Sequence, residues 1–193
     1  MPLLIGNFNE LLVSKADYIQ LFSLFGMNSE GWLLAELLHF LWAEELRGNV
    51  KEFQPQKTII QAENKRQLHD VWLRVDNTEL LCELKSFCTN YCGSPGKNIT
   101  DRIDDILEAM NRVQKRCEKE SSLPLVLALL YPFCDGEAEK RACDHHLRKL
   151  MSGSLPSFHE YKIPLPGSDT ACARLLGWTI AHAGEIAWDT AAV

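Results

Sequence analysis

Three side chains of types used in acid–base and metal chemistry lie close together in the sequence, at Asp70, Glu83 and Lys85. The pair Asp76-Asn77 between them is a turn signal and predicts a β-hairpin with a two-residue loop. In that register Asp70 stands directly opposite Glu83, and opposed residues project from the same face of a sheet with Cβ atoms about 5 Å apart. Lys85 lies two residues beyond Glu83 and therefore shares this face. A four-residue loop would keep the three side chains on one face, whereas a three-residue loop would separate Asp70 from the other two.

Two carboxylates this close repel each other unless a positive charge lies between them. A hard divalent cation with oxygen ligands meets that need, and magnesium is the usual ion at phosphate sites. Asp70 and Glu83 are therefore the predicted metal ligands, with the backbone carbonyl of Leu84 as a further oxygen. Lys85 would face both the ion and a bound phosphate, where an ammonium group can orient or deprotonate the attacking water and offset charge on the phosphorus.

The patterns around this hairpin predict an alternation of helices and strands. Residues 32–42 are rich in helix formers and apolar on nearly every face, which is typical of a helix buried on most sides. The continuous apolar run from Leu123 to Tyr131 is typical of a buried strand. In chain order we expect a helix over 29–48, strands over 57–61, 68–75 and 79–87, a helix from residue 100, a strand over 123–131, a helix over 136–151, a strand over 158–165 and a helix over 170–182. Strands mixed with helices on both sides predict an α/β or α+β sandwich. Of the two we expect α/β, a three-layer sandwich in which a central mixed β-sheet is flanked by helices.

The arrangement resembles the PD-(D/E)xK nuclease superfamily, the restriction-endonuclease-like proteins. The pattern of that family is an Asp at the start of one hairpin strand and Glu-x-Lys on the next, and here these positions are Asp70 and Glu83-Leu84-Lys85. His69 stands where the family's name-giving Pro would be. The order of helices and strands between residues 29 and 131 also looks like the core of that family. We expect this core within a single nuclease-like domain that spans residues 1–193.

The resemblance implies a magnesium-dependent endonuclease that hydrolyses phosphodiester bonds in nucleic acid, DNA ahead of RNA, with manganese able to replace magnesium. It implies catalytic roles for Asp70, Glu83 and Lys85. Many members add a Glu on the first helix of the core, for which Glu30 is the best match and Glu36 the second choice. Cleavage of both strands of a duplex would favour a homodimer.

The overall charge favours a different class of function. The chain has a formal net charge of -6 at pH 7, whereas phosphate contacts usually need a basic surface. The alternative is therefore a catalytically silent nuclease-like fold that acts as a binding or assembly module. Four basic side chains on the expected helix after residue 100 are candidates for phosphate binding, although acidic neighbours fit a solvated helix face as well: Arg112, Lys115, Arg116 and Lys119.

Composition and the first residues predict the compartment. The seven cysteines have irregular spacing, which fits no disulfide scaffold. The start of the sequence lacks the basic residues and long apolar run of a signal peptide, and no stretch approaches the ~18 apolar residues of a membrane span. We therefore expect a reduced, cytoplasmic protein without membrane contacts.

Overall fold

The computed structural model describes residues 2–55, 58–60, 66–68, 70–134, 145–151, 155, 157–169 and 171–180. Its α-helices are α1 (Pro2–Val13), α2 (Ala16–Phe25), α3 (Glu30–Leu46) and α4 (Ile99–Glu120), and a short 3-10 helix η1 (Tyr91–Gly93) precedes α4. Its strands are β1 (Glu52–Pro55), β2 (Thr58–Ile60), β3 (Arg66–Leu68), β4 (Val71–Val75), β5 (Thr78–Cys88), β6 (Leu123–Cys134), β7 (Ser157–Pro164) and β8 (Ala171–Thr179). Residues 145–151 are also helical.

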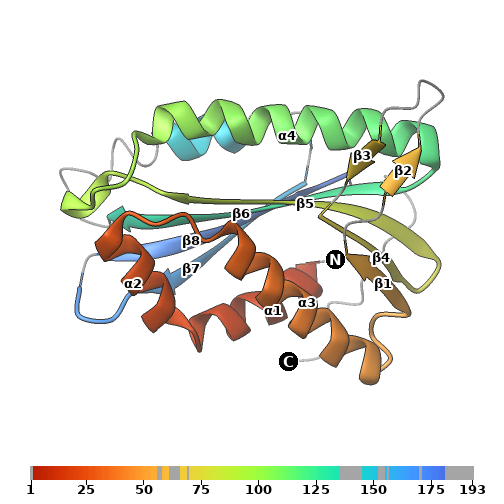
Figure 1. The fold of residues 1–193 in the computed structure, drawn as a ribbon, viewed down its shortest axis with the longest axis horizontal. Helices are drawn as coiled ribbons and strands as arrows, with labels where there is room; N and C mark the ends of the chain where they lie inside the picture. The colour runs from red at the N-terminus through yellow and green to blue at the C-terminus, as the bar shows by residue number, and fades with distance from the viewer. Residues whose placement is uncertain are drawn as a thin grey trace.

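Six strands form one mixed sheet in the order β1-β4-β5-β6-β8-β7 (Figure 1). β5 and β6 run parallel, and the other neighbouring strands of this sheet pair antiparallel. Parallel neighbours need a long crossover connection, and α4 supplies it between β5 and β6. β2 and β3 form a separate two-stranded sheet.

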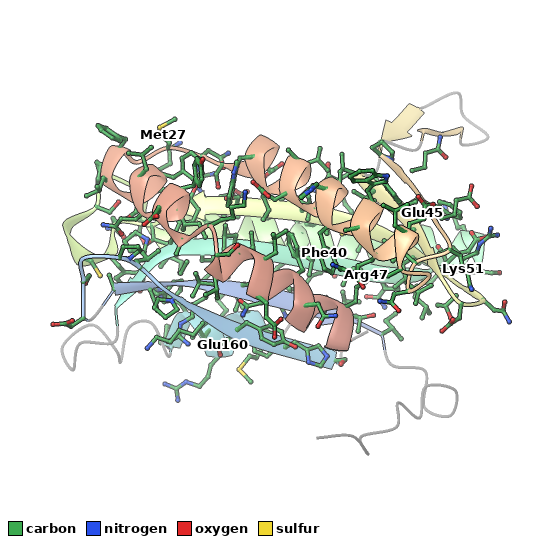
Figure 2. All side chains as sticks on the ribbon, turned by 90° about the horizontal axis from the view of Figure 1, so that it is seen from below. Met27, Phe40, Glu45, Arg47, Lys51 and Glu160 are labelled. Carbon is green, nitrogen blue, oxygen red and sulfur yellow. The ribbon has the colours of Figure 1, made fainter. Side chains whose placement is uncertain are left out.

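Helices cover both faces of the six-stranded sheet. α1, α2 and α3 lie on one face and α4 crosses the other (Figure 1), where Lys149 of the helical residues 145–151 contacts Asp104 of α4 at 3.0 Å. Each interface has its own buried apolar cluster. Figure 2 looks onto the layer of α1–α3, in which Phe40 lies between α3 and α1 and packs on Phe8 with ring centroids 5.4 Å apart. The fold is α/β, with a mixed sheet flanked by helices, and is compatible with the predicted three-layer sandwich.

The elements at the centre of the chain follow the predicted order. α3 matches the expected helix over 29–48, and β4, β5 and β6 match three of the expected strands. α4 is strongly amphipathic, with an apolar stripe that packs on the sheet. Its N-cap is Asn98, whose side chain accepts a hydrogen bond of 3.0 Å from the Thr100 N–H. This differs from the expected start of the helix at Thr100, because the side-chain cap lies two residues earlier.

The helix expected over residues 170–182 is wrong, since residues 171–179 form β8 between β6 and β7. β8 is buried on both faces, so its sequence has no alternation of apolar and polar residues, and its Ala and Leu residues resemble a helical run. Gly177 in β8 lies where α1 approaches the sheet. A Cβ at this position would come within 2.9 Å of the Ile5 side chain.

The N-terminal part contains more elements than the sequence predicts. α1 and α2 precede the first predicted helix. The strand expected over residues 57–61 exists as β2, but it pairs with β3, and β1 takes the place beside β4. Residues 136–144 of the helix expected over 136–151 lie outside the described residues, whereas residues 145–151 are helical.

The cysteines differ from the expectation at one position. Cys92 is disulfide-bonded, so the expectation of a fully reduced chain is wrong there. Four others are buried free thiols: Cys82, Cys88, Cys117 and Cys172. In the part of the chain that the structure describes, no helix combines the length and the apolar character needed to cross a membrane.

Candidate active site

The β4–β5 hairpin has the predicted register. Val75 pairs with Thr78 across a two-residue loop, and the ladder continues to Val71 opposite Cys82. Asp76 in the loop has a positive φ of 52°, a conformation that Asp tolerates better than most residues. The predicted loop residues are therefore confirmed, and with them the pairing on which the candidate site depends.

Alternation along the hairpin puts the candidate residues on the face that α4 covers. Trp72 and Leu81 pair with each other, and both belong to the apolar cluster under α4. Steps of two residues lead from Trp72 to Asp70 and from Leu81 to Glu83 and Lys85. Strand geometry therefore gives the three side chains a common face.

Asp70 lies one residue before β4, where the backbone ladder with β5 ends and a side-chain hydrogen bond replaces it. Its Oδ2 accepts a hydrogen bond of 2.7 Å from the backbone N–H of Leu84. Burial raises the pKa of the Asp70 carboxyl above its ordinary value, and the charge of Glu83 adds to that rise, while the Leu84 N–H, Lys85 and Arg112 lower the pKa by less. Leu84 thus contacts Asp70 through its backbone N–H. From the sequence, its carbonyl oxygen is instead the expected contributor, as a metal ligand.

Glu83 and Lys85 are at the centre of an ion-pair cluster. Lys85 Nζ lies 3.7 Å from Glu83 Oε1 and 3.4 Å from Glu30 Oε1. From the side of α4, Arg112 Nη2 lies 3.1 Å from the same Glu83 oxygen, and Arg112 Nη1 lies 3.4 Å from Glu108 Oε1. The Glu83 and Lys85 side chains are only 11% and 16% exposed, against 41% for Arg112. The central charges are therefore the ones least screened by water.

Of the two glutamates considered on the first predicted helix, only Glu30 contacts this cluster. Glu30 is in the first turn of α3, where its carboxylate reaches Lys85. Glu36 lies further along the same helix and pairs with Lys15 at 3.8 Å. The geometry therefore groups Glu30, and not Glu36, with the hairpin residues.

Buried hydroxyl groups fix the start of α3 against the sheet. The Tyr131 hydroxyl of β6 donates to the Met27 carbonyl at 2.7 Å and lies 2.9 Å from Ser29 Oγ. Ser29 Oγ in turn lies 2.7 Å from Ser86 Oγ of β5. This network holds the helical turn that carries the glutamate of the cluster. Sequence reasoning missed it, because its members are up to 104 residues apart.

Arg112 is the other member that sequence reasoning did not place. The sequence pattern named it only as one of four candidates for phosphate binding on the expected helix, without a link to Glu83. Its contact with Glu83 joins a helix to a strand across 29 residues, and periodicity within one element does not predict packing between two elements.

Asp70 and Glu83 supply carboxylate oxygens, the type of donor that a hard divalent cation prefers. Within the described residues, no three or more His, Cys, Asp and Glu side chains gather as a set of metal ligands. Magnesium, however, is commonly bound through one or two carboxylates, with water and phosphate oxygens as its other ligands. Asp70 interacts through its charge with Glu83, Lys85 and Arg112, whereas Glu30 pairs with Lys85 and Glu108 with Arg112.

Another polar site lies away from this cluster, in a cleft of about 400 Å³ between α1 and α3. Glu44 lines the cleft and is buried. Its Oε1 pairs with Arg47, and its Oε2 accepts a hydrogen bond of 2.7 Å from Asn49. Both oxygens of Glu44 have partners at the end of α3. These contacts explain why this carboxylate is buried, without the need for a role in binding or catalysis.

Comparisons with known proteins assign no family to the chain. No family model, no curated protein and no solved structure matches it. The function proposed below therefore rests on residue types and on the geometry of Asp70, Glu83, Lys85, Glu30 and Arg112.

Proposed function

We propose that this protein is a metal-dependent nuclease that hydrolyses phosphodiester bonds, with DNA as its main substrate. The observation that carries the proposal is the meeting of Asp70, Glu83 and Lys85 on one face of a hairpin. Burial and the charge of Glu83 raise the pKa of Asp70, and a carboxylate perturbed in this way is typical of functional sites. Lys85 beside it contacts Glu83 and Glu30, so acidic and cationic groups converge at one place.

The order of elements supports a restriction-endonuclease-like core. α3, the β4–β5 hairpin, α4 and β6 follow one another along the chain, in the order expected of the PD-(D/E)xK family. In this proposal Asp70 fills the first motif position and Glu83-Leu84-Lys85 the second. His69, at the position of the name-giving Pro, lies outside the described residues.

Asp70 and Glu83 are the proposed ligands of magnesium or manganese, with the Leu84 carbonyl as a further oxygen. When bound, the ion would act as a Lewis acid toward the phosphate and lower the pKa of the attacking water. Asp70 is held in place for this role by the Leu84 N–H. Glu83 is held by its place on β5, where it pairs with Val126 of β6 one residue beyond the end of the ladder with β4.

Lys85 is the proposed group that handles the attacking water. Its Nζ contacts two carboxylates, Glu83 and Glu30, so two partners limit where the ammonium group can move. From there it would orient the water and offset the negative charge that develops on the phosphate oxygens. Glu30 acts through Lys85 and is therefore a positioning residue.

Cleavage by single-site variants tests the proposal. The purified chain is incubated with single- and double-stranded DNA and RNA, in magnesium, in manganese and in chelator. Asp70→Ala, Glu83→Ala and Lys85→Ala should each lower kcat by about 100-fold or more, because each removes a group that acts on the reacting atoms. Glu52→Ala is the control, since this carboxylate of β1 pairs with Arg74 at 2.7 Å near the loop end of the hairpin, four residues along β4 from Asp70, where the Glu52 side chain is 54% exposed. Cleavage that survives in chelator or in the Asp70 and Glu83 variants would contradict the proposal.

The ion pairs favour one alternative, a nuclease-like fold that binds a partner without catalysis. Glu83 already has two cationic partners, Lys85 and Arg112. The net charge of -6 also disfavours a large surface for nucleic acid. Wild-type protein that binds no divalent ion and cleaves none of the four substrates would support this alternative.

A further inference from the structure

Two cationic side chains already lie at one oxygen of Glu83, the proposed metal ligand. Arg112 Nη2 lies 3.1 Å from Glu83 Oε1, and Lys85 Nζ lies 3.7 Å from the same atom. A carboxylate oxygen in such a charge-assisted hydrogen bond has less electron density to give to a cation. A divalent ion at Glu83 would also lie close to the guanidinium, and like charges repel strongly where water is largely excluded. In this position Arg112 would therefore weaken the binding of a divalent ion at Glu83.

Arg112 is the partner that can move. Its side chain is 41% exposed on α4, whereas that of Glu83 is 11% exposed on a central strand. Glu108, one turn earlier on α4, lies 3.4 Å from Arg112 Nη1 and is 70% exposed. If the Arg112 guanidinium moves away from Glu83, it therefore keeps Glu108 of α4 as a partner.

We infer that Arg112 competes with the divalent ion for Glu83 and that the released guanidinium binds the phosphodiester of the substrate. The inference rests on the proposed function and adds a substrate-binding residue to it. A guanidinium presents paired N–H donors that match two oxygens of one phosphate. After release, Arg112 remains anchored on α4 opposite Glu83, so a phosphate at the hairpin stays within reach of its side chain.

This exchange couples the two ligands of the site. Ion binding at Glu83 frees Arg112 for the phosphate, and phosphate binding draws Arg112 away from Glu83. Each ligand should therefore raise the affinity for the other, because coupling between two binding events is reciprocal.

Manganese titration without nucleic acid tests the competition. Calorimetry on the full chain compares wild type with Arg112→Ala, Arg112→Lys and Arg102→Ala. Arg112→Ala should bind manganese about tenfold more tightly, as expected when one partly exposed competing charge is removed, and Arg112→Lys should fall between the two. Arg102→Ala is the matched control. Arg102 also forms an ion pair on α4, with Asp105 at 3.1 Å, but it lies about 15 Å from Arg112 toward the start of the helix. The manganese affinity of Arg102→Ala should equal that of wild type.

Cleavage kinetics at saturating magnesium test the second role of Arg112. Arg112→Ala should raise KM for DNA about tenfold and weaken inhibition by inorganic phosphate to a similar extent, because the phosphate loses a bidentate partner. Arg112→Lys should recover part of this loss, since it keeps the charge without the paired donors. Thermal unfolding of each variant shows whether it is folded, and Arg112→Lys keeps the test valid if the alanine variant is not.

Three results would overturn the inference in different ways. Manganese affinity in Arg112→Ala that is equal to or weaker than wild type would exclude the competition. Tighter manganese binding with unchanged KM and unchanged phosphate inhibition would exclude the role in substrate binding. Wild type that binds no manganese would overturn both this inference and the proposed function, whereas wild type that binds manganese and cleaves DNA leaves the proposed function standing whatever Arg112→Ala shows.

Discussion

At the scale of single residues, Asp70 carries a charge that folding makes less favourable. Burial and the neighbouring Glu83 raise the pKa of the Asp70 carboxyl above its ordinary value. Between the unfolded and folded pKa values the folded protein binds more protons, so the free energy of unfolding falls as the pH rises. The cost is fully present above the raised pKa and absent below the unfolded one.

Asp70→Asn should therefore stabilise the protein at pH 7 in chelator. The amide oxygen of Asn can still accept the hydrogen bond from the Leu84 N–H, which is 2.7 Å long in the wild type, while the charge is gone. We expect a gain of about 0.5–1 kcal/mol in the free energy of unfolding, a value discounted for partial exposure of the site. Urea unfolding at a series of pH values measures it. The gain should shrink as the pH falls toward about 4, and a variant that is less stable than wild type at pH 7 would contradict this account of Asp70.

The two glutamates of α3 give a paired prediction. Glu30→Gln should lower kcat roughly tenfold without unfolding the chain, because Lys85 loses one of its two charged partners and is positioned less well. Glu36→Gln should leave kcat unchanged, since Glu36 contacts Lys15 instead. Cleavage rates and thermal unfolding of both variants check this. Equal rates in wild type and Glu30→Gln would remove Glu30 from the site.

The sequence predicts contacts between site residues only where the geometry of a single hairpin determines them. Asp70, Glu83 and Lys85 share a face because side chains alternate along strands and Asp76-Asn77 form a two-residue turn. The approach of Arg112 depends on how α4 packs across the sheet. That packing is set by the whole apolar interface, and no spacing along the chain encodes it.

At the scale of elements, the start of α3 is held by hydroxyl groups in a buried layer. Tyr131→Phe removes the donor to the Met27 carbonyl and a partner of Ser29 Oγ. It should lower the free energy of unfolding by about 1–3 kcal/mol, because the buried Ser29 hydroxyl and the partly buried Met27 carbonyl both lose a partner. It should also speed amide exchange at Leu33, whose N–H donates to the Ser29 carbonyl at 2.8 Å in the first turn of α3.

Tyr18→Phe is the control for this change. Tyr18 is 53% exposed on α2, so the loss of its hydroxyl should alter neither stability nor exchange. Urea unfolding and exchange measured by nuclear magnetic resonance compare the two variants. If Tyr131→Phe and Tyr18→Phe behaved alike, the hydroxyl network would have no part in fixing the helix start.

Elements with a clear period were predictable, and elements buried on all sides were not. α4 has one apolar stripe and β6 a continuous apolar run, and both appear as expected. β8 has apolar residues on both faces, because it lies between β6 and β7 under helices on each side. Its sequence therefore fits a helix as well as a strand, and only its neighbours decide between them.

At the scale of the whole molecule, the fold class followed from the order of elements, whereas the strand order did not. Alternating helices and strands predict layers, and the sheet covered by α1–α3 and by α4 agrees with this (Figure 1). Which strand lies at an edge depends on long-range pairing. Thus β1 joined the main sheet and β2 did not, although both are short and lie before the hairpin.

For the site as a whole, we propose that Asp70 and Glu83 of the hairpin hold one divalent ion that Lys85 does not bind. Calorimetry of magnesium binding tests it most directly, on wild type and on Asp70→Ala, Glu83→Ala and Lys85→Ala. We predict one ion per chain in the wild type, loss of binding in Asp70→Ala and in Glu83→Ala, and retained binding in Lys85→Ala. Magnesium that binds with wild-type affinity to both carboxylate variants, or to no form of the protein, would contradict the claim.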